Sequence, residues 1–465
     1  MACTWCGISA TGWSFTGGEF VIAIASLAAA LAIGFLLVRA WMPELQGASA
    51  ILFLAGCGAA LGLGIDSLSF FALTVAGAAG AWWPGLAQAL LLAAALWLYR
   101  KRVPHARRPT PPPQRRFSPA ASMTAIVLGA ELVLMLVSFI SISHVNPHGA
   151  WDAWSIWNLR ARYLAGGLAS WRYAVSKHII LQHPDYPLLT SSLIAHAWSS
   201  AHSIAASVPI AVALLFTLAT VLALVAGLVW SRGVLPGLCA GAMLLAVTGW
   251  LKLGTSQYAD IPLGFYFLVT IALLCAARND ARFALLAGVM ASLSAWTKDE
   301  GLMFTGACVV VTMVLIGAKP ARMVLAGALP VIVFLVWFKL RIAPGLDPMW
   351  HQGAGVMLAK LFTGGRYAAI AAQLVKHTAA IRELLILPLF ALALGFKPDR
   401  AALACFALIG LMLIGFFGVY VVSPYPLEWY LDSSLDRLYL QLTPAFLFAW
   451  FRASPGTRGS DTIGS

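Results

Sequence analysis

Carboxylates and cations gather in four short stretches of a chain that otherwise carries little charge. The first stretch, GAWDAWSIWNLRARYLAGG at residues 149–167, places Asp152 between tryptophans and follows it with Arg160 and Arg162. The others are QHPDYPLL with His183, Asp185 and Tyr186, WTKDEGL with Lys298, Asp299 and Glu300, and LDRLYLQLTP with Arg437. A carboxylate can take the proton of a hydroxyl group, and arginine or lysine can hold a phosphate. The four stretches together offer a base and an anion-binding surface.

Common catalytic and metal-binding motifs are absent from the sequence. It has no G-x-S-x-G, no H-E-x-x-H and no P-loop, so hydrolase, zinc peptidase and ATPase chemistry find no support. The C-x-x-C of Cys3 and Cys6 has no second pair and no nearby histidine, which makes it a weak metal or redox motif. No cofactor is required if cations hold the anion, although Asp152 with Asp185 could chelate a divalent metal. The remaining cysteines lie in apolar segments and are expected to be small buried hydrophobes: Cys57, Cys239, Cys275, Cys308 and Cys405.

The composition requires that lipid surround most of the chain. Of its 465 residues, 61% are hydrophobic and only 10% are charged, against about a quarter in soluble domains. The sequence therefore predicts an all-α polytopic membrane protein, because a helix satisfies its own backbone groups in lipid. Residues 1–18 contain no Lys or Arg, and the apolar run behind them is too long for a signal peptide. The net charge of +13 fits the positive-inside rule, and no basic–aromatic module suggests nucleic acid.

The apolar runs and the basic loops predict how the chain crosses the membrane. The proline-rich basic loop 100–118 is expected in the cytoplasm, and alternation from it places the N-terminus and the tail 452–465 there too. About fourteen runs could span: 19–39, 48–64, 67–81, 84–99, 119–142, 203–230, 234–250, 261–277, 283–297, 301–317, 323–341, 383–396, 401–422 and 437–451.

The same alternation gathers acidic residues on the outer side. The outer carboxylates are Asp152, Asp185, Asp260, Asp299, Glu300, Asp347, Glu383, Glu428, Asp432 and Asp436, from a total of 17 acidic residues. Exclusion of basic residues from outer loops could produce this bias. A shared external site is the other explanation, because acidic residues contribute little to topology.

Two outer loops, 143–202 and 342–382, are long enough to hold structure of their own. In the first, a helix over 151–164 would lie along the membrane surface and fix the depth of Asp152. One face of this helix would point toward the membrane and carry Trp154, Trp157, Ala161 and Leu164. The other face would point away from it and carry Ser155, Asn158 and Arg162. Spans 283–297 and 301–317 reach only roughly 22 Å, so the KDEG turn between them should lie in a water-filled recess. The alternative is a self-paired turn, Lys298 with Glu300.

Each candidate also has a purely structural interpretation. Asp152 could be a charge favoured by a helix N-terminus, and His183 could satisfy a loop backbone group. Arg437 could anchor the last helix or bond Gln441 one turn away. Asp260, in SQYADIP, is more simply a cap of the span that Pro262 begins. The tryptophans at 151, 154 and 157 could each be a platform on which a sugar stacks, but residues of the interfacial belt are the simpler interpretation.

The four stretches, in this order, resemble the GT-C superfamily of membrane glycosyltransferases. More narrowly, WDAWSIWNLRA, HPDYPLL, WTKDEGL and LDRLYLQLTP resemble prokaryotic relatives of protein O-mannosyltransferases and of the enzyme that adds aminoarabinose to lipid A. The resemblance covers roughly residues 119–451. In that superfamily one large external loop follows the first helix of a conserved module and another follows the seventh, and loops 143–202 and 342–382 have this spacing here.

The resemblance implies a division of the chain and roles for its residues. A catalytic module would span 119–341, followed by helices in 383–451, and residues 1–99 would form an accessory bundle of four spans. Asp152 would be the catalytic base, with Asp185 as second choice because the family's first loop often carries a pair of acids. The phosphate of the donor would bind Lys298, Arg437 and Arg160. The rest of the substrate would contact His183, Tyr186, Asp299, Glu300 and Trp154.

The sequence thus predicts a membrane glycosyltransferase that acts on the outer face of a bacterial inner membrane. It would move a sugar from a polyprenyl-phosphate donor to a lipid, glycan or protein acceptor, with inversion. The alternative is a transporter or lipid flippase that uses the recessed KDEG charges. The absence of internal repeats and the asymmetric long loops favour the enzyme.

Overall fold

The computed structural model describes residues 17–78, 82–104, 118–278, 280–343, 345 and 348–455, and within these ranges helices joined by short loops are the only regular secondary structure. The C-x-x-C motif, most of the basic loop 100–118 and Asp347 lie outside the described residues. Seven helical stretches are long and apolar enough to cross a membrane. The prediction of an all-α polytopic membrane protein is therefore confirmed. The seven are α1 (Gly17–Trp41), α2 (Ala48–Val75), α4 (Pro119–Val145), α7 (Ser207–Arg232), α13 (Ala318–Arg341), α18 (Arg400–Val422) and the stretch Gly364–Leu394, which contains α16 (Gly364–His377) and α17 (Leu387–Leu394).

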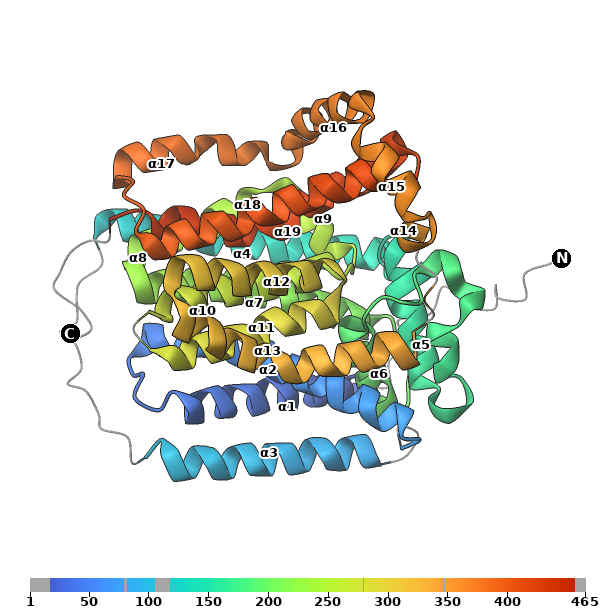
Figure 1. Ribbon diagram of the computed structural model, residues 1–465. Coiled ribbons are helices and arrows are strands. Elements are labelled where there is room, and N and C mark those ends of the chain that lie inside the picture. The colour runs from blue at the N-terminus through green and yellow to red at the C-terminus, as the bar shows by residue number, and fades with distance from the viewer. Residues whose placement is uncertain are drawn as a thin grey trace.

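Shorter helices fill the middle of the bundle (Figure 1). The helices α8 (Val234–Ala246) and α9 (Thr248–Thr255) form one broken segment, bent by 67°. Three more short helices follow in the chain: α10 (Asp260–Ala276), α11 (Ala281–Thr297) and α12 (Glu300–Val311), which a π-helical turn, Thr312–Ile316, extends. Two further long helices, α3 (Trp83–Arg102) and α19 (Leu427–Arg452), run alongside. Helices α10 and α11 are almost entirely buried, so both lie in the interior of the bundle.

Small residues allow the central helices to touch backbone to backbone. A Cβ atom at Gly62 of α2 would lie 1.9 Å from the carbonyl oxygen of Ala30 in α1. One at Gly288 of α11 would lie 2.0 Å from the carbonyl oxygen of Val324 in α13. Helix association in lipid depends on close packing because no hydrophobic force acts between the helices. These two contacts therefore fix α1 on α2 and α11 on α13.

The two ends of the bundle carry different groups. At one end, the carboxylate of Asp399 pairs with Arg232 at 2.7 Å and with Arg452 at 3.0 Å. We call this the basic end. The opposite end, which we call the site end, carries α5 (Asn158–Ala165) and α6 (Leu189–Ala201), together with α14 (Pro348–His351) and α15 (Ala354–Leu361) (Figure 1).

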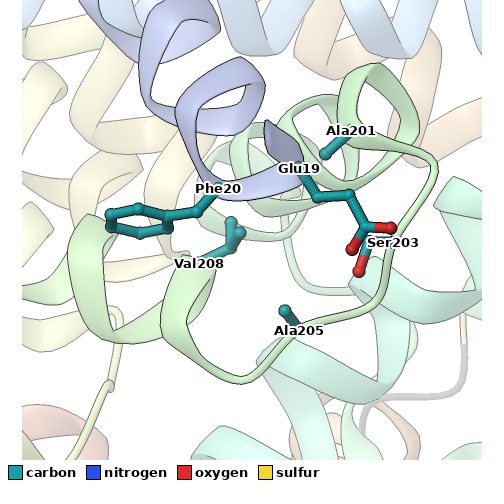
Figure 2. Close-up of a pocket in the computed structure, with 6 residues that line it drawn as sticks. All are labelled: Glu19, Phe20, Ala201, Ser203, Ala205 and Val208. Carbon is teal, nitrogen blue, oxygen red and sulfur yellow. The ribbon is translucent and has the colours of Figure 1, made fainter. Parts of the chain in front are cut away.

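The structure corrects the predicted path of the first helices. Runs 48–64 and 67–81 were expected to be separate spans, but α2 passes through both as one helix, so three helices and not four precede residue 103. Figure 2 shows Glu19 and Phe20 of α1 beside Ser203 and Val208 in a shallow depression with no room for a water molecule. Helix α1 thus begins at the site end, whereas α19 ends at the basic end. The prediction of both termini on one side is wrong at the level of these helices, because merging two spans changes the parity.

One other predicted boundary also changes. The apolar run 383–396 was expected to begin a span, but the helical stretch starts at Gly364, inside the predicted loop 342–382. Among the N-terminal helices, α2 packs against α7 and α6 and contributes a largely buried face. Small residues such as Gly56, whose Cβ would lie 3.1 Å from that of Ala223, make this packing possible.

Candidate functional site

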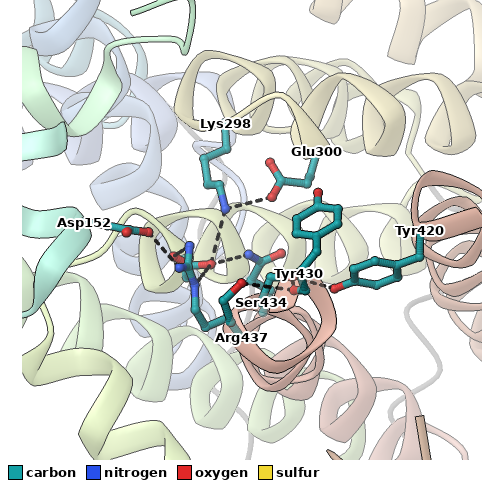
Figure 3. Close-up of polar contacts among 10 residues, drawn as sticks. Asp152, Lys298, Glu300, Tyr420, Tyr430, Ser434 and Arg437 are labelled. Atoms are coloured by element: carbon teal, nitrogen blue, oxygen red, sulfur yellow. Dashed lines mark hydrogen bonds and ion pairs between the residues drawn. The ribbon is translucent and has the colours of Figure 1, made fainter. Parts of the chain in front are cut away.

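Five charged side chains from four parts of the chain meet at the site end. We call them the central charge cluster: Asp152, Asp260, Lys298, Glu300 and Arg437. Arg437 holds Asp152 at 2.7 Å through one guanidinium nitrogen and Asp260 at 3.3 Å through the other. Lys298 lies 3.4 Å from Asp260 and 2.7 Å from Glu300 (Figure 3). Three predicted site residues that are far apart in sequence, Asp152, Lys298 and Arg437, are thus brought together.

Asp260 lies at the centre of this cluster, and its interpretation as a helix cap is wrong. The carboxylate is fully buried and makes no capping bond, since the cap position of α10 is Ala259. Instead it accepts a short hydrogen bond from the amide of Gln441 as well as the contacts with both cations. Gln441 and Arg437 stand one turn apart on α19, so one helix face directs both donors at Asp260. An acid at the start of a span, followed by proline, was the signal in the sequence.

Aromatic and hydroxyl groups line the other side of Arg437. Its guanidinium lies over the ring of Tyr258, 4.7 Å from the centroid. Burial raises the pKa of Tyr258, and the neighbouring Asp152 carboxylate adds to this effect, so the phenol keeps its proton at neutral pH. Tyr420 of α18 bonds Ser434 of α19 at 2.8 Å on the same side (Figure 3). None of these hydroxyl groups was singled out from the sequence, because tyrosine and serine carry no spacing signal there.

A second group of charges, the lateral charge cluster, consists of Asp185, Asp299 and Lys339. The Lys339 ammonium lies 2.9 Å from the Asp299 carboxylate, donates to the backbone carbonyl of Asp185 at 2.7 Å, and lies 3.6 Å from the Asp185 carboxylate. Burial raises the pKa of Asp299 to about 6, although the Lys339 ammonium opposes the shift. Asp152 and Asp185 therefore pair with different cations, Arg437 and Lys339. Among the described residues, no three histidine, cysteine or acidic side chains are grouped so that they could hold a metal ion.

The KDEG turn distributes its charges between the two clusters. Lys298 and Glu300 pair with each other, as the structural alternative expected, but Lys298 also reaches Asp260. Asp299, between them, points to Lys339 instead. The Lys298 side chain is only 4% exposed, which agrees with a recessed turn. A buried ammonium is tolerated there because carboxylates on two sides compensate its lost hydration.

Arg160 has a structural environment that differs from the predicted phosphate ligand. Its side chain is fully buried, and its guanidinium donates to the backbone carbonyls of Ala174, Pro184 and Tyr186 at 2.7–3.0 Å. The bonds to Pro184 and Tyr186 fix the backbone of the HPDYP stretch. We therefore assign Arg160 to positioning that stretch and leave it out of the anion site. With a further bond to the carbonyl of His183 at 3.4 Å, four of its five N–H donors are engaged with backbone oxygens, and the side chain has no exposed surface on which a ligand could bind.

The HPDYP side chains form a stack that leads to the tryptophans. The His183 ring stacks on Tyr186 with centroids 4.6 Å apart, and Tyr186 stacks on Trp157 at 5.9 Å. His183 has a positive φ of 47°, which turns the chain sharply before Pro184. Asp185 is thereby directed at Lys339, so the stretch contributes one carboxylate and an aromatic wall.

The predicted surface helix 151–164 exists, but with a shifted register. Residues Ala153–Trp157 form a π-helical turn that runs into α5. Trp157 and Leu164 were expected to face the membrane but are buried inside the protein, whereas Trp154, expected on the same face, is half exposed next to Trp151. The extra residue in the π-helical turn rotates the helix and separates these side chains. Asn158, expected to face away, is buried and donates to Gln257 at 3.0 Å. The π-helical turn is common at functional sites and directs Asp152 at Arg437.

Acidic groups outnumber basic ones across both clusters. Five carboxylates face three cations, which leaves a net charge of −2 when all are ionised. The Asp152 and Arg437 side chains are 20% and 23% exposed, whereas Asp260 is fully buried. The Asp152–Arg437 pair is therefore a partly exposed edge of the central charge cluster, and an anion that takes the Arg437 nitrogen bound to Asp152 must replace that carboxylate.

Comparison with known proteins adds no assignment. No family model, no curated protein and no solved structure matches this chain. The functional conclusion accordingly depends on the chemistry of the two charge clusters.

Proposed function

We propose that the protein is an integral-membrane glycosyltransferase of the GT-C type. It transfers a sugar from a polyprenyl-phosphate donor to an acceptor hydroxyl at the outer face of a bacterial inner membrane. The observation that carries the proposal is the Asp152–Arg437 pair, which combines a base and a phosphate ligand at a partly exposed edge of the central charge cluster. Exposed Trp151 and Trp154 beside it favour a position at headgroup depth, where the donor phosphate lies.

The reaction begins with an exchange of partners at Arg437. The donor phosphate takes the guanidinium nitrogen that held Asp152, and Asp152 is released toward the acceptor. The acceptor oxygen attacks the anomeric carbon from the face opposite the phosphate while Asp152 accepts its proton. The bond between that carbon and the phosphate oxygen breaks, and polyprenyl phosphate leaves as an anion. Arg437 and the nearby Lys298 stabilise its charge, and the configuration of the sugar is inverted.

The acceptor base is tested by sugar transfer from a radiolabelled polyprenyl-phosphate donor. Asp152→Asn should lose about 10²–10⁴-fold in turnover, which is the usual contribution of a general base. Asp185→Asn is the matched control, because its carboxylate faces Lys339 instead of Arg437. If both variants transfer sugar at the rate of the unchanged protein, the mechanism is wrong. If only Asp185→Asn is inactive, Asp185 is the base and Asp152 is not.

A transporter remains the second candidate because of a buried ionisable pair. Asp66 of α2 and His196 of α6 lie 2.9 Å apart with side chains only 4% and 3% exposed. Ionisable groups at such positions are expensive and often mark proton or substrate pathways. A transporter would move substrate across sealed vesicles in a way that depends on Asp66 and His196 and survives Asp152→Asn. Loss of sugar transfer without any flux would exclude this candidate.

A further inference from the structure

Two cysteines from different helices meet near the basic end. Cys275 lies in the last turn of α10, and Cys405 lies in the second turn of α18. Their sulfur atoms are 3.3 Å apart, and both are free thiols. A disulfide bond is about 2.0 Å long, so an approach of little more than 1 Å would join them. Contact at this distance between helices that are far apart in sequence makes the pair a candidate for oxidation.

The surroundings of the pair supply positive charge. Arg452 and Asp399 both act electrostatically on Cys275. Asp399 is shared by Arg452 and Arg232, so one carboxylate faces two guanidinium groups and the local balance is positive. A thiolate is favoured near cations, and the thiolate is the nucleophile in thiol oxidation. Cys275 is partly exposed whereas Cys405 is buried, so Cys275 is the thiol that a small oxidant reaches first.

The other described cysteines do not share these features. Cys57, Cys239 and Cys308 are buried in three different helices, α2, α8 and α12. Hydroxyl groups of threonines, not a second thiol, bond Cys239 and Cys308. Buried thiols without a cationic neighbour behave as inert hydrophobes. These cysteines therefore serve as internal controls.

We propose that Cys275 and Cys405 form a reversible redox pair that a small peroxide converts to a disulfide. The Cys275 thiolate attacks one peroxide oxygen, the O–O bond breaks, and the other oxygen leaves as water after taking a proton. The resulting sulfenic acid is attacked by the Cys405 sulfur, the S–O bond breaks, and a second water leaves. Two thiols and one hydrogen peroxide thus give one disulfide and two waters. A dithiol reductant restores both thiols by exchange.

The disulfide would link two helices that also frame the central charge cluster. Helix α10 starts at Asp260, and α18 ends close to Tyr420, which bonds Ser434 beside Arg437. A bond at the basic end would restrict sliding of these helices against each other. The proposal concerns oxidation chemistry alone and does not require sugar transfer.

The test uses the full chain in lipid nanodiscs with Cys3→Ser and Cys6→Ser, so that the N-terminal motif consumes no oxidant. After treatment with hydrogen peroxide, the protein is unfolded in detergent so that every remaining thiol is accessible, free thiols are blocked with N-ethylmaleimide, and peptides are analysed by mass spectrometry. We expect a cross-linked peptide joining Cys275 and Cys405, lost after dithiothreitol. Cys57 and Cys308 should be alkylated throughout.

Single variants separate the two steps. Cys405→Ser should leave Cys275 as a sulfenic acid that dimedone traps, and Cys275→Ser should remove the reaction. Cys308→Ser is the matched control and should retain the cross-link. Arg452→Gln should slow cross-linking, and Arg452→Lys should keep most of the rate. Full alkylation of Cys275 and Cys405 after peroxide, or a disulfide of either with another cysteine, would overturn the proposal.

Discussion

Replacing Asp152 by asparagine should have opposite effects on donor binding and on turnover. In the structure the Asp152 carboxylate accepts a hydrogen bond of 2.7 Å from a guanidinium nitrogen of Arg437. In the proposed reaction the donor phosphate binds the same nitrogen. The two side chains are 20% and 23% exposed, so the pair lies between an exposed and a buried ion pair. Exposed pairs contribute about 0–1 kcal/mol, and breaking buried ones costs about 3–5 kcal/mol, so about 1–2 kcal/mol is reasonable here.

That energy opposes donor binding because the pair must be broken first. An asparagine in its place holds Arg437 less strongly, so the donor should bind about 5- to 30-fold more tightly to the variant. Turnover should fall at the same time, because the amide cannot accept the acceptor proton. A residue that only bound substrate would instead weaken the complex when it is replaced.

The assay measures both quantities on the same protein. Binding of the intact polyprenyl-phosphate sugar is followed by calorimetry in nanodiscs without acceptor, and transfer is followed with acceptor present. The matched control is Glu428→Gln, which replaces an exposed acid in the first turn of α19, the helix that carries Arg437. This variant should change neither donor binding nor turnover. Weaker donor binding in Asp152→Asn, or normal turnover, would refute the exchange of partners at Arg437.

Three further outcomes follow from the contacts. Asp299 has a pKa of about 6, so it is protonated below that pH and its charge no longer repels the donor; donor affinity should therefore fall as the pH rises through 6, and Asp299→Asn should flatten this profile. The intact donor is a phosphodiester and does not itself titrate in this range. Asp66→Ala should lower the thermal midpoint in detergent, because it leaves His196 without its buried partner and costs about 3–5 kcal/mol; an unchanged midpoint would contradict a structural role. Arg160→Met should destabilise the HPDYP stretch and increase its proteolysis, whereas weaker donor binding with unchanged proteolysis would restore Arg160 as a phosphate ligand.

The sequence determined the class of protein and one end of the molecule. Its hydrophobic content required lipid around most of the chain, and the long apolar runs predicted helices, because a helix satisfies its own backbone groups there. The alternation of basic and acidic loops placed Asp152, Lys298 and Arg437 at one end, and the structure brings these three together. The sequence can predict this location because the basic residues of each short loop indicate the side of the membrane on which that loop lies.

Only the tertiary structure decided which charges pair. Asp260 reads as a cap in sequence, yet the approach of α19 to α10 surrounds it with Arg437 and Gln441. Arg160 was predicted to bind the donor phosphate, yet the fold of the HPDYP stretch buries it against carbonyl groups. A π-helical turn shifts the register of the helix after Asp152, and no periodicity in the sequence signals one extra residue. The partner of a charge depends on which helices lie side by side, and that follows from packing across the whole bundle, not from neighbours in the chain.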